Sequence, residues 1–233
     1  MLTQTTIRAS APPAYFAAPP EDRVVNGRPP RDLLATILHL IGAVVSYRRN
    51  TELFGENEPA DYLYKVVSGG VRTYKILSDG RRQISAFYLP QDMFGLEFAG
   101  EYSCSAEAIS DAKVLVVNRK TLTALAGRDA EIARELFVLT AHELQRVHKR
   151  VLLLVKTAQE RVASFLVEMA ERGSAGNAIE LPMSRQDIAD YLGLTIETVS
   201  RTFTQLQAAR QIDLISCRRV LLRNPEALER ICE

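Results

Sequence analysis

The spacing of hydrophobic residues changes twice along this chain, from helical to strand-like and back to helical. The first helical run covers residues 31–42, and Gly42 ends it. Its apolar positions recur at the spacing of a helix face: Leu33, Leu34, Ile37, Leu40 and Ile41. The pattern predicts a small packing helix.

Between Ala43 and Val117 the chain consists of short runs rich in Val, Ile, Tyr and Thr, such as YLYKVVSGGVRTYKIL and RQISAFYL. Turn-forming pairs separate these runs: Gly69-Gly70, Asp79-Gly80 and Ser110-Asp111. Such pairs supply the positive φ that tight hairpins require. Many short strands joined by tight turns predict an antiparallel barrel or roll.

Residues 128–172 contain no proline and no glycine, and their hydrophobic residues share one helical stripe. This pattern predicts one long helix. Within the stripe, spacings of three and four alternate, as in a seam between two identical helices. The positions are Leu144, Val147, Val151, Leu154 and Ala158. Simple amphipathicity explains the same stripe if the helix lies on its own domain, so the stripe alone leaves both interpretations open.

A composition break, GSAGNAIE, marks the start of a second predicted domain over 173–233. The following MSRQDIADYLGLTIETVSR, residues 183–201, contains two short helical patterns. Ser184 can cap the first helix, Gly193 permits the turn that ends it, and Thr195 can cap the second. This order of signals predicts a helix-turn-helix.

The second of these helices has one apolar and one polar face. Val199, Phe203 and Leu206 recur at i, i+4 and i+7 and are expected in the core. The opposite face then carries Ile196, Glu197, Ser200, Arg201 and Thr204. An arginine can fork to guanine, a glutamate can accept from the cytosine amine, and an isoleucine can touch a thymine methyl. The polar face therefore suits the major groove of DNA.

The sequence after this helix, QIDLISCRRVLLRN, predicts a strand, a turn and a second strand, with Arg218 and Arg219 at the tip. The whole motif is then a winged helix-turn-helix. Only one acid, Asp213, accompanies the arginines of this region, which form a local basic patch. They are Arg201, Arg210, Arg218, Arg219 and Arg223.

A structural alternative is that Glu197 and Arg201 form only a surface salt bridge one helical turn apart. Taken alone, that pair is common on helices. The caps, the turn glycine, the apolar register, the wing and the arginine patch all point to DNA binding instead, and agreement at so many levels is unusual by chance.

Composition adds limits to this picture. The chain has 29 Lys and Arg against 28 Asp and Glu, a formal net charge of +1, so any nucleic-acid site must be a local patch. No apolar run is long enough to span a membrane and no signal-peptide pattern is present, which predicts a cytoplasmic protein without a membrane partner. The three cysteines are scattered and lack metal-ligand spacing, as expected in a reducing compartment.

The segment SRQDIADYLGLTIETVSR closely resembles the helix-turn-helix of the Crp/Fnr superfamily of bacterial transcription regulators, especially its FixK-like branch. YLYKVVSGGVRTYKI, DGRRQISAFYLPQDMFG, the long helix and the wing match the family in the same order. The resemblance implies an α+β fold with an N-terminal antiparallel β-roll of the cyclic-nucleotide-binding jelly-roll type. It also implies a long helix that pairs in a homodimer and a C-terminal winged helix-turn-helix.

On this basis we divide the chain into a flexible N-terminal arm (1–30), a β-roll (31–127), a long dimerisation helix (128–172) and a DNA-binding domain (173–233). The arm, rich in Pro and Ala, lies outside the resemblance. The dimer interface is expected at the five seam positions, which include Leu154.

In the family, the glutamate, serine and arginine of E-x-x-S-R contact bases, and these match Glu197, Ser200 and Arg201. Ile196 occupies the position that tunes specificity among branches. The remaining groups of the motif and wing are assigned to DNA phosphates: Ser184, Arg185, Thr195, Thr198, Arg218 and Arg219. The FixK-like resemblance implies a palindromic operator with TTG and CAA outer triplets.

The cyclic-nucleotide-binding branch uses a Gly-Glu pair for the ribose and an Arg-Ser pair for the phosphate. Here Leu96 follows Gly95, and Cys104 precedes Ser105. Without the arginine, the cyclic phosphate would lack a charged partner, so cyclic AMP is not expected. Glu97 remains a shifted alternative for the ribose.

Two metal sites are also set aside. Fnr proteins carry an N-terminal cysteine cluster for a 4Fe–4S centre, and residues 1–50 contain no cysteine. HELQRVH at 142–148 lacks the zinc-protease spacing, because position 146 is Arg where a second histidine is needed. We therefore expect no metal, no cofactor and, since no nucleophile is paired with a base, no enzyme activity.

Cys217, beside two arginines in the wing, is a candidate for oxidation close to DNA phosphates. Cys104 is most simply a small core residue.

The main hypothesis is a homodimeric transcription activator that binds double-stranded DNA and contacts RNA polymerase, linked by resemblance to low-oxygen and nitrogen-fixation genes. The alternatives are a regulator that needs an effector in the β-roll and a regulatory domain that acts on a protein partner.

Overall fold

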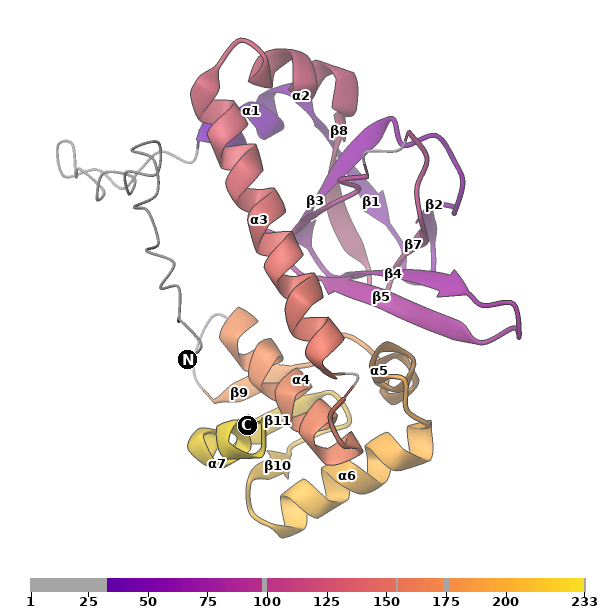
Figure 1. Ribbon diagram of the computed structural model, residues 1–233, viewed down its shortest axis with the longest axis vertical. Coiled ribbons are helices and arrows are strands. Elements are labelled where there is room, and N and C mark those ends of the chain that lie inside the picture. Colours follow the sequence, from indigo (N-terminus) through magenta and orange to yellow (C-terminus); the bar gives the residue numbers. More distant parts are fainter. Residues whose placement is uncertain (1–32, 98–99, 154, 174–176, 233) are drawn as a thin grey trace, which may run out of the picture. The chain divides into compact units, whose positions relative to one another are not determined.

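The computed structural model describes residues 33–97, 100–153, 155–173 and 177–232 (Figure 1). The arm expected over 1–30 lies outside these residues, as does Leu154. No helix of the described chain is long and apolar enough to cross a membrane.

Eight strands form the two sheets of the β-roll, as the short runs rich in Val, Ile, Tyr and Thr and the turn pairs between them predict. One sheet has the order β1 (Ala43–Tyr47), β8 (Ala112–Asn118), β3 (Tyr62–Ser68), β6 (Met93–Phe94). The other has the order β2 (Glu52–Phe54), β7 (Ser105–Ala108), β4 (Val71–Ile76), β5 (Arg82–Tyr88). Neighbouring strands are antiparallel in both sheets, which confirms the predicted antiparallel β-roll.

Two of the predicted turn pairs need glycine for steric reasons. Gly69 has φ of +79°, and a Cβ there would lie 2.3 Å from the carbonyl oxygen of Asp111. Gly80, in the turn between β4 and β5, has φ of +83°. Side chains rarely adopt this left-handed conformation, so both turns depend on glycine.

Aromatic rings fill the interior of the β-roll. Phe54 stacks on Tyr102 with ring centroids 3.7 Å apart, and Phe94 stacks on both Tyr64 and Tyr88 at 5.1 and 4.7 Å. Each ring buries a large apolar area, and the stacking adds a smaller specific term.

Three helices pack around a second cluster at the end of the roll: α1 (Leu33–Ile41), α2 (Arg119–Ala126) and α3 (Ala130–Leu153). The short helix predicted over 31–42 is α1, with Leu34 and Leu38 buried. The Leu34 backbone N–H, in the first turn of α1, donates to the Glu135 carboxylate of α3 at 2.9 Å, which holds α1 against that helix.

The prediction of a single helix over residues 128–172 is wrong. Helix α3 ends at Leu153, and a separate helix, α4, covers Ala158–Arg172. Thr157 caps α4 in a capping box: its hydroxyl accepts from the Glu160 N–H at 3.3 Å, and its own N–H donates to the Glu160 carboxylate at 2.6 Å. The sequence TAQE therefore starts a new helix although the hydrophobic period continues across it.

Helix α4 packs with the C-terminal elements, so the domain boundary expected at Gly173 falls too late. Val162, Phe165, Leu166 and Met169 of α4 share one core with the helix-turn-helix and the wing. These elements are β9 (Ala178–Glu180), α5 (Arg185–Leu192), α6 (Ile196–Ala208), β10 (Ile212–Leu214), β11 (Arg219–Leu222) and α7 (Pro225–Cys232).

Helix α7 was not predicted. Its signals are present in the sequence: the Asn224 side chain accepts from the Ala227 N–H at 3.0 Å, Pro225 occupies the first helical position, and Glu226 lies in the first turn. At eight residues, its apolar pattern is short.

Candidate DNA-binding surface

The first helix of the motif, α5, is defined at both ends by the expected residues. At its start, the Asp187 N–H donates to the Ser184 hydroxyl at 3.1 Å, and the Ser184 N–H donates to the Asp187 carboxylate at 3.0 Å. At its end, Gly193 has φ of +65° and donates its N–H to Ala189. This left-handed glycine allows the sharp turn into α6.

The second helix, α6, begins at the expected cap, where the Thr198 N–H donates to the Thr195 hydroxyl at 3.2 Å. The three predicted core residues, Val199, Phe203 and Leu206, are 0%, 1% and 0% exposed. Thr202 is also buried, although its polar side chain did not indicate this. Its hydroxyl can be buried because it donates to the Thr198 carbonyl at 2.9 Å.

The predicted base-contacting residues all lie on the exposed face of α6. Ile196 is 37% exposed, and Glu197, Ser200 and Arg201 are also exposed. Among the described side chains, no ion pair joins Glu197 to Arg201. The surface salt bridge is therefore not formed, and the guanidinium is available to another partner.

Glu197 lies in the first turn of α6, where backbone N–H groups point outward. Its own backbone N–H and then the Thr195 hydroxyl donate hydrogen bonds that lower the pKa of this carboxyl. The side chain is therefore ionised at neutral pH and can only accept hydrogen bonds. That property fits a donor such as the amine of cytosine.

The wing is a hairpin of β10 and β11, with Leu214 opposite Val220. Arg218 lies in its turn and is half-buried, and Arg219, the first residue of β11, is exposed, so both lie at the tip of the hairpin as predicted. One arginine of the basic patch is neutralised, since Arg223 pairs with Asp213 at 2.5 Å.

Two of the residues assigned to phosphates are engaged within the protein. The Ser184 hydroxyl donates to the Asp187 carboxylate at 2.8 Å. The Arg185 guanidinium lies 3.3 Å from the ring centre of Phe203, and burial lowers its pKa to about 10. Its Nη1 is buried without a hydrogen-bond partner in the described structure, so an anion at this helix start would satisfy it.

The β-roll holds α5 through arginine residues that the sequence did not single out. Arg72 on β4 and Arg82 on β5 both pair with one carboxylate oxygen of Asp187, at 2.8 and 2.7 Å. Arg82 also pairs with Asp190 at 2.7 Å. Asp187 is only 4% exposed, and the same carboxylate caps α5. This arginine pair therefore fixes the helix-turn-helix against the β4–β5 hairpin.

Helix α3 leaves most of the predicted seam uncovered. Leu144, Val147 and Val151 are 55%, 50% and 55% exposed, and Phe137, one heptad before Leu144, is 73% exposed. Ala158 is the first residue of α4 and so does not continue this stripe on the same helix.

The β-roll contains a cavity of about 380 Å³ whose lining includes Gly95, Leu96 and Cys104, the positions compared above with the cyclic-nucleotide-binding branch. Its described lining contains no arginine, and its lysine, Lys75, pairs with Glu56 at 2.9 Å. A carboxylate oxygen of Glu97 is buried there without a partner. A nucleotide phosphate would lack a counter-charge, so these residues do not fit cyclic AMP. Burial raises the pKa of the Cys104 thiol in the same wall, as expected for a core cysteine.

Comparisons with protein families match two parts of the chain. Residues 44–129 match the model of the cyclic nucleotide-binding domain, and residues 160–231 match the Crp-like helix-turn-helix domain. The second match begins inside α4, in agreement with the packing of that helix against the wing.

Individual relatives cover most of the chain. It is 50% identical over 203 residues to the nitrogen fixation regulation protein FixK of Azorhizobium caulinodans, covering 84% of this chain and 82% of that protein. It is 41% identical to the protein of the same name from Rhizobium meliloti, covering 81% and 87%. The solved structure of FixK2 from Bradyrhizobium japonicum matches with a TM-score of 0.80 and 48% identity, covering 83% of this chain and 98% of that one.

The fold and the exposed polar face of α6 define a transcription regulator that binds DNA through a winged helix-turn-helix. The chain belongs to the Crp/Fnr family, in its FixK-like branch.

Proposed function

We propose that this chain works as a homodimeric activator that binds a palindromic operator without a bound cofactor. The observation that carries the proposal is the exposed polar face of α6, whose Arg201 has no ion-pair partner in the described chain. The names of the FixK relatives support a role in nitrogen-fixation genes, and the family resemblance supports control under low oxygen.

The dimer is proposed to form along α3. Its exposed stripe has the heptad spacing of a helix pair, and exposed apolar side chains of this size favour burial against another protein surface. In a two-fold dimer, the two α6 helices would meet major grooves about one turn, roughly 34 Å, apart. A palindromic operator follows from that symmetry.

Base contacts are proposed for Ile196, Glu197, Ser200 and Arg201, and phosphate contacts for Thr195, Thr198, Arg218 and Arg219. Arg185 and Ser184 lie at the start of α5, where the helix N-terminus itself favours a phosphate. Contacts to RNA polymerase would come from exposed surface elsewhere on the dimer.

Binding to synthetic duplexes tests this function. Protein dialysed free of small molecules should bind a palindrome with TTG and CAA outer triplets, measured by fluorescence anisotropy. When those triplets are exchanged for other sequences, the tighter, sequence-specific binding should be lost and only non-specific binding should remain. Binding only after a cell extract is added would contradict the cofactor-free proposal, and equal binding to both duplexes would contradict base recognition.

Oxidation of Cys217 is proposed as a modifier of this binding. The thiol is exposed in the wing, close enough to Arg185 to influence that residue's pKa. A sulfinic or sulfonic acid there would place negative charge near DNA phosphates. Peroxide should weaken operator binding of the parent and spare Cys217→Ala. Equal loss in both proteins would remove the idea.

A further inference from the structure

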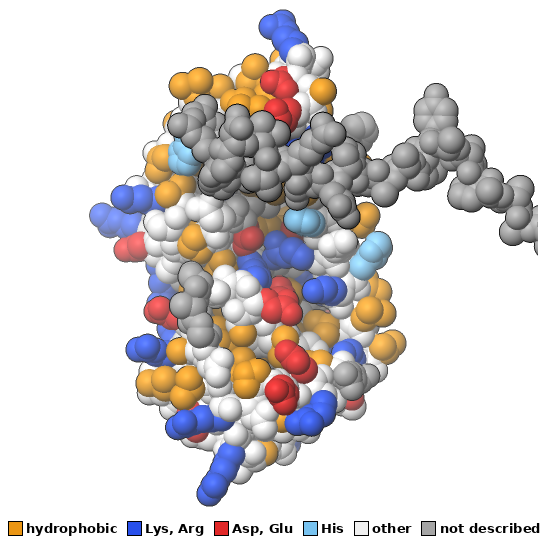
Figure 2. Space-filling view, turned by 90° about the vertical axis from the view of Figure 1, so that its left-hand side faces the viewer, with side chains coloured by type: hydrophobic (Ala, Val, Ile, Leu, Met, Phe, Trp, Pro, Cys, Tyr) orange, Lys and Arg blue, Asp and Glu red, His pale blue; other side chains and the backbone are white. Residues whose placement is uncertain are grey.

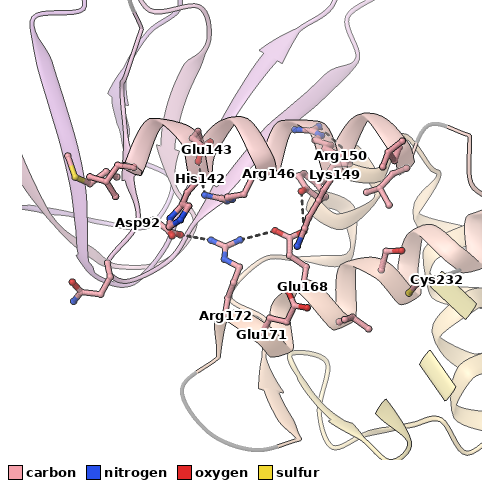
Figure 3. Close-up of a pocket in the computed structure, with 18 of the residues that line it drawn as sticks. Asp92, His142, Glu143, Arg146, Lys149, Arg150, Glu168, Glu171, Arg172 and Cys232 are labelled. Carbon is pink, nitrogen blue, oxygen red and sulfur yellow. Dashed lines mark hydrogen bonds and ion pairs between the residues drawn. The ribbon is translucent and has the colours of Figure 1, made fainter. Parts of the chain in front are cut away.

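A second cavity, of about 500 Å³, lies between α3, α4 and the part of the β-roll around β6, which contributes Asp92, Met93 and Leu96 (Figure 3). Arg146, Lys149 and Arg150 of α3 line it together with Glu168 and Arg172 of α4. Figure 2 shows basic and acidic side chains gathered at mid-height of one face, between apolar patches. The volume falls in the range of small-molecule sites.

Three of the four carboxylates that line this cavity pair with two of its arginines, and the fourth, Glu171, is exposed to solvent. Arg172 pairs with Asp92 and, at 3.3 Å, with Glu168. Arg146 pairs with Glu143 at 3.0 Å. No carboxylate in the described structure pairs with the other cations of the lining, which are Lys149, Arg150 and Lys156.

Among these cations, Arg150 gives the clearest indication of an anion site, because the groups that it contacts are all neutral. Its guanidinium lies 4.4 Å from the ring centre of Tyr191 and donates to the carbonyl oxygens of Ile84 and Tyr191. Burial lowers its pKa, which reflects the cost of holding a charge there without a counter-ion. An anion in the cavity would reduce that cost.

The α4 wall supplies an unused hydrogen-bonding group. The Ser164 hydroxyl lines the cavity and is buried without a hydrogen-bond partner in the described chain. Buried polar atoms are rarely left unpaired, so a ligand oxygen at this position would satisfy the hydroxyl. The rest of the lining includes apolar side chains from three elements: Met93, Leu96, Leu139, Leu153 and Val167.

We propose that this cavity binds an organic acid anion with an apolar body. The carboxylate would lie toward Lys149, Arg150 and Ser164, and the apolar body would lie against the aliphatic side chains. Because two of its walls belong to α3, which ends at Leu153, and α4, which begins at Ala158, an occupied cavity would connect these two helices. The site adjoins the β-roll cavity, with which it shares Met93, Leu96 and Glu143, and it is separate from the base-contacting face of α6.

Octanoate is the probe for this site. The matched ligands are 1-octanol, which has the apolar chain without the negative charge, and inorganic phosphate, which has negative charge without the apolar chain. Isothermal titration calorimetry on the full chain should show saturable binding of octanoate and much weaker binding of the other two. Equal affinity for 1-octanol would overturn the anion site, and equal affinity for phosphate would overturn the apolar part. Absence of octanoate binding would overturn the whole proposal.

Two variants locate the binding. Lys149→Gln should weaken octanoate binding by about tenfold or more, because a charge-assisted hydrogen bond is lost, and Ser164→Ala by about threefold. The control is Lys113→Gln, which removes an exposed lysine on β8 that does not line the cavity. Operator affinity without octanoate should be unchanged in all three, which verifies their folding. Unchanged octanoate affinity in folded Lys149→Gln would place the probe elsewhere.

Discussion

Helices α3 and α6 each present a stripe of side chains that nothing in the described chain covers, and the chemistry of the two stripes is opposite. On α3 the stripe is apolar, with Phe137, Leu144 and Val151 more than half exposed. On α6 the stripe is polar and includes Glu197 and Arg201. An apolar stripe lowers its free energy by leaving water, whereas a polar stripe needs a partner with donors and acceptors.

The two helices also differ in how firmly their own chain holds them. Helix α6 has four buried residues among 13, and their packing in the core fixes which face of the helix is exposed. Helix α3 has 24 residues and one fully buried side chain, Ile132. Helix α6 therefore has its conformation fixed within the chain, and the exposed stripe of α3 supports the proposal that a second copy of the chain covers it.

The largest effect is expected when the apolar stripe of α3 is charged. Leu144→Glu should abolish the dimer, because the interface would then bury one carboxylate from each protomer near the two-fold axis. Operator affinity should fall roughly 100-fold or more as a result. Sedimentation velocity measures the first result and anisotropy the second. Gln145→Glu adds the same charge to the neighbouring exposed residue and should stay dimeric. A dimeric Leu144→Glu protein would show that the stripe is not the interface.

The next effect concerns the polar stripe of α6. Arg201→Ala should weaken operator binding by about 1–3 kcal/mol and relax the preference at one base pair, since a bidentate contact is lost. Binding should be compared across duplexes that vary at each position. The control is Arg210→Ala, which removes the same charge at a residue beyond the end of α6. Retained base preference in Arg201→Ala would contradict its assignment.

A smaller, uniform effect is expected in the wing. Arg218→Ala should weaken binding to all duplexes alike, and the slope of log affinity against log salt should fall by about one, because one phosphate contact is lost. Identical patterns for Arg218→Ala and Arg201→Ala would remove the distinction between phosphate and base contacts.

The smallest effect concerns the carboxylate of Glu197. Its pKa is lowered in the folded protein, so its contribution to stability is present above the pKa of the unfolded chain and is lost as pH falls through the folded value. Glu197→Gln should therefore melt slightly below the parent at neutral pH, and the two should converge at acidic pH. Calorimetry across that range measures the difference, and a gap that widens on acidification would contradict the assigned hydrogen bonds.

Local signals in the sequence were sufficient for the β-roll, for the helix-turn-helix and for the two faces of α6. Ser184, Gly193 and Thr195 act on their immediate neighbours, and the buried register of Val199 and Phe203 follows from helical spacing alone. Such features need no knowledge of the rest of the fold.

Other features depend on distant parts of the chain and were missed. Arg72 and Arg82 meet Asp187 across 115 and 105 residues, and nothing local marks those pairs. The helix break at Thr157 had a local signal, the capping box, but the hydrophobic period masked it. The cavity between α3 and α4 is lined by residues as far apart in the sequence as Asp92 and Cys232, so it was missed as well.

The shared carboxylate of Asp187 has a consequence for anyone who recombines this protein with its relatives. One side chain both begins α5 and anchors the hairpin arginines, so the N-terminal and C-terminal halves are not interchangeable parts. A chimaera joined at the Thr157 cap would align its DNA-binding half correctly only if the incoming half carries acids at positions 187 and 190.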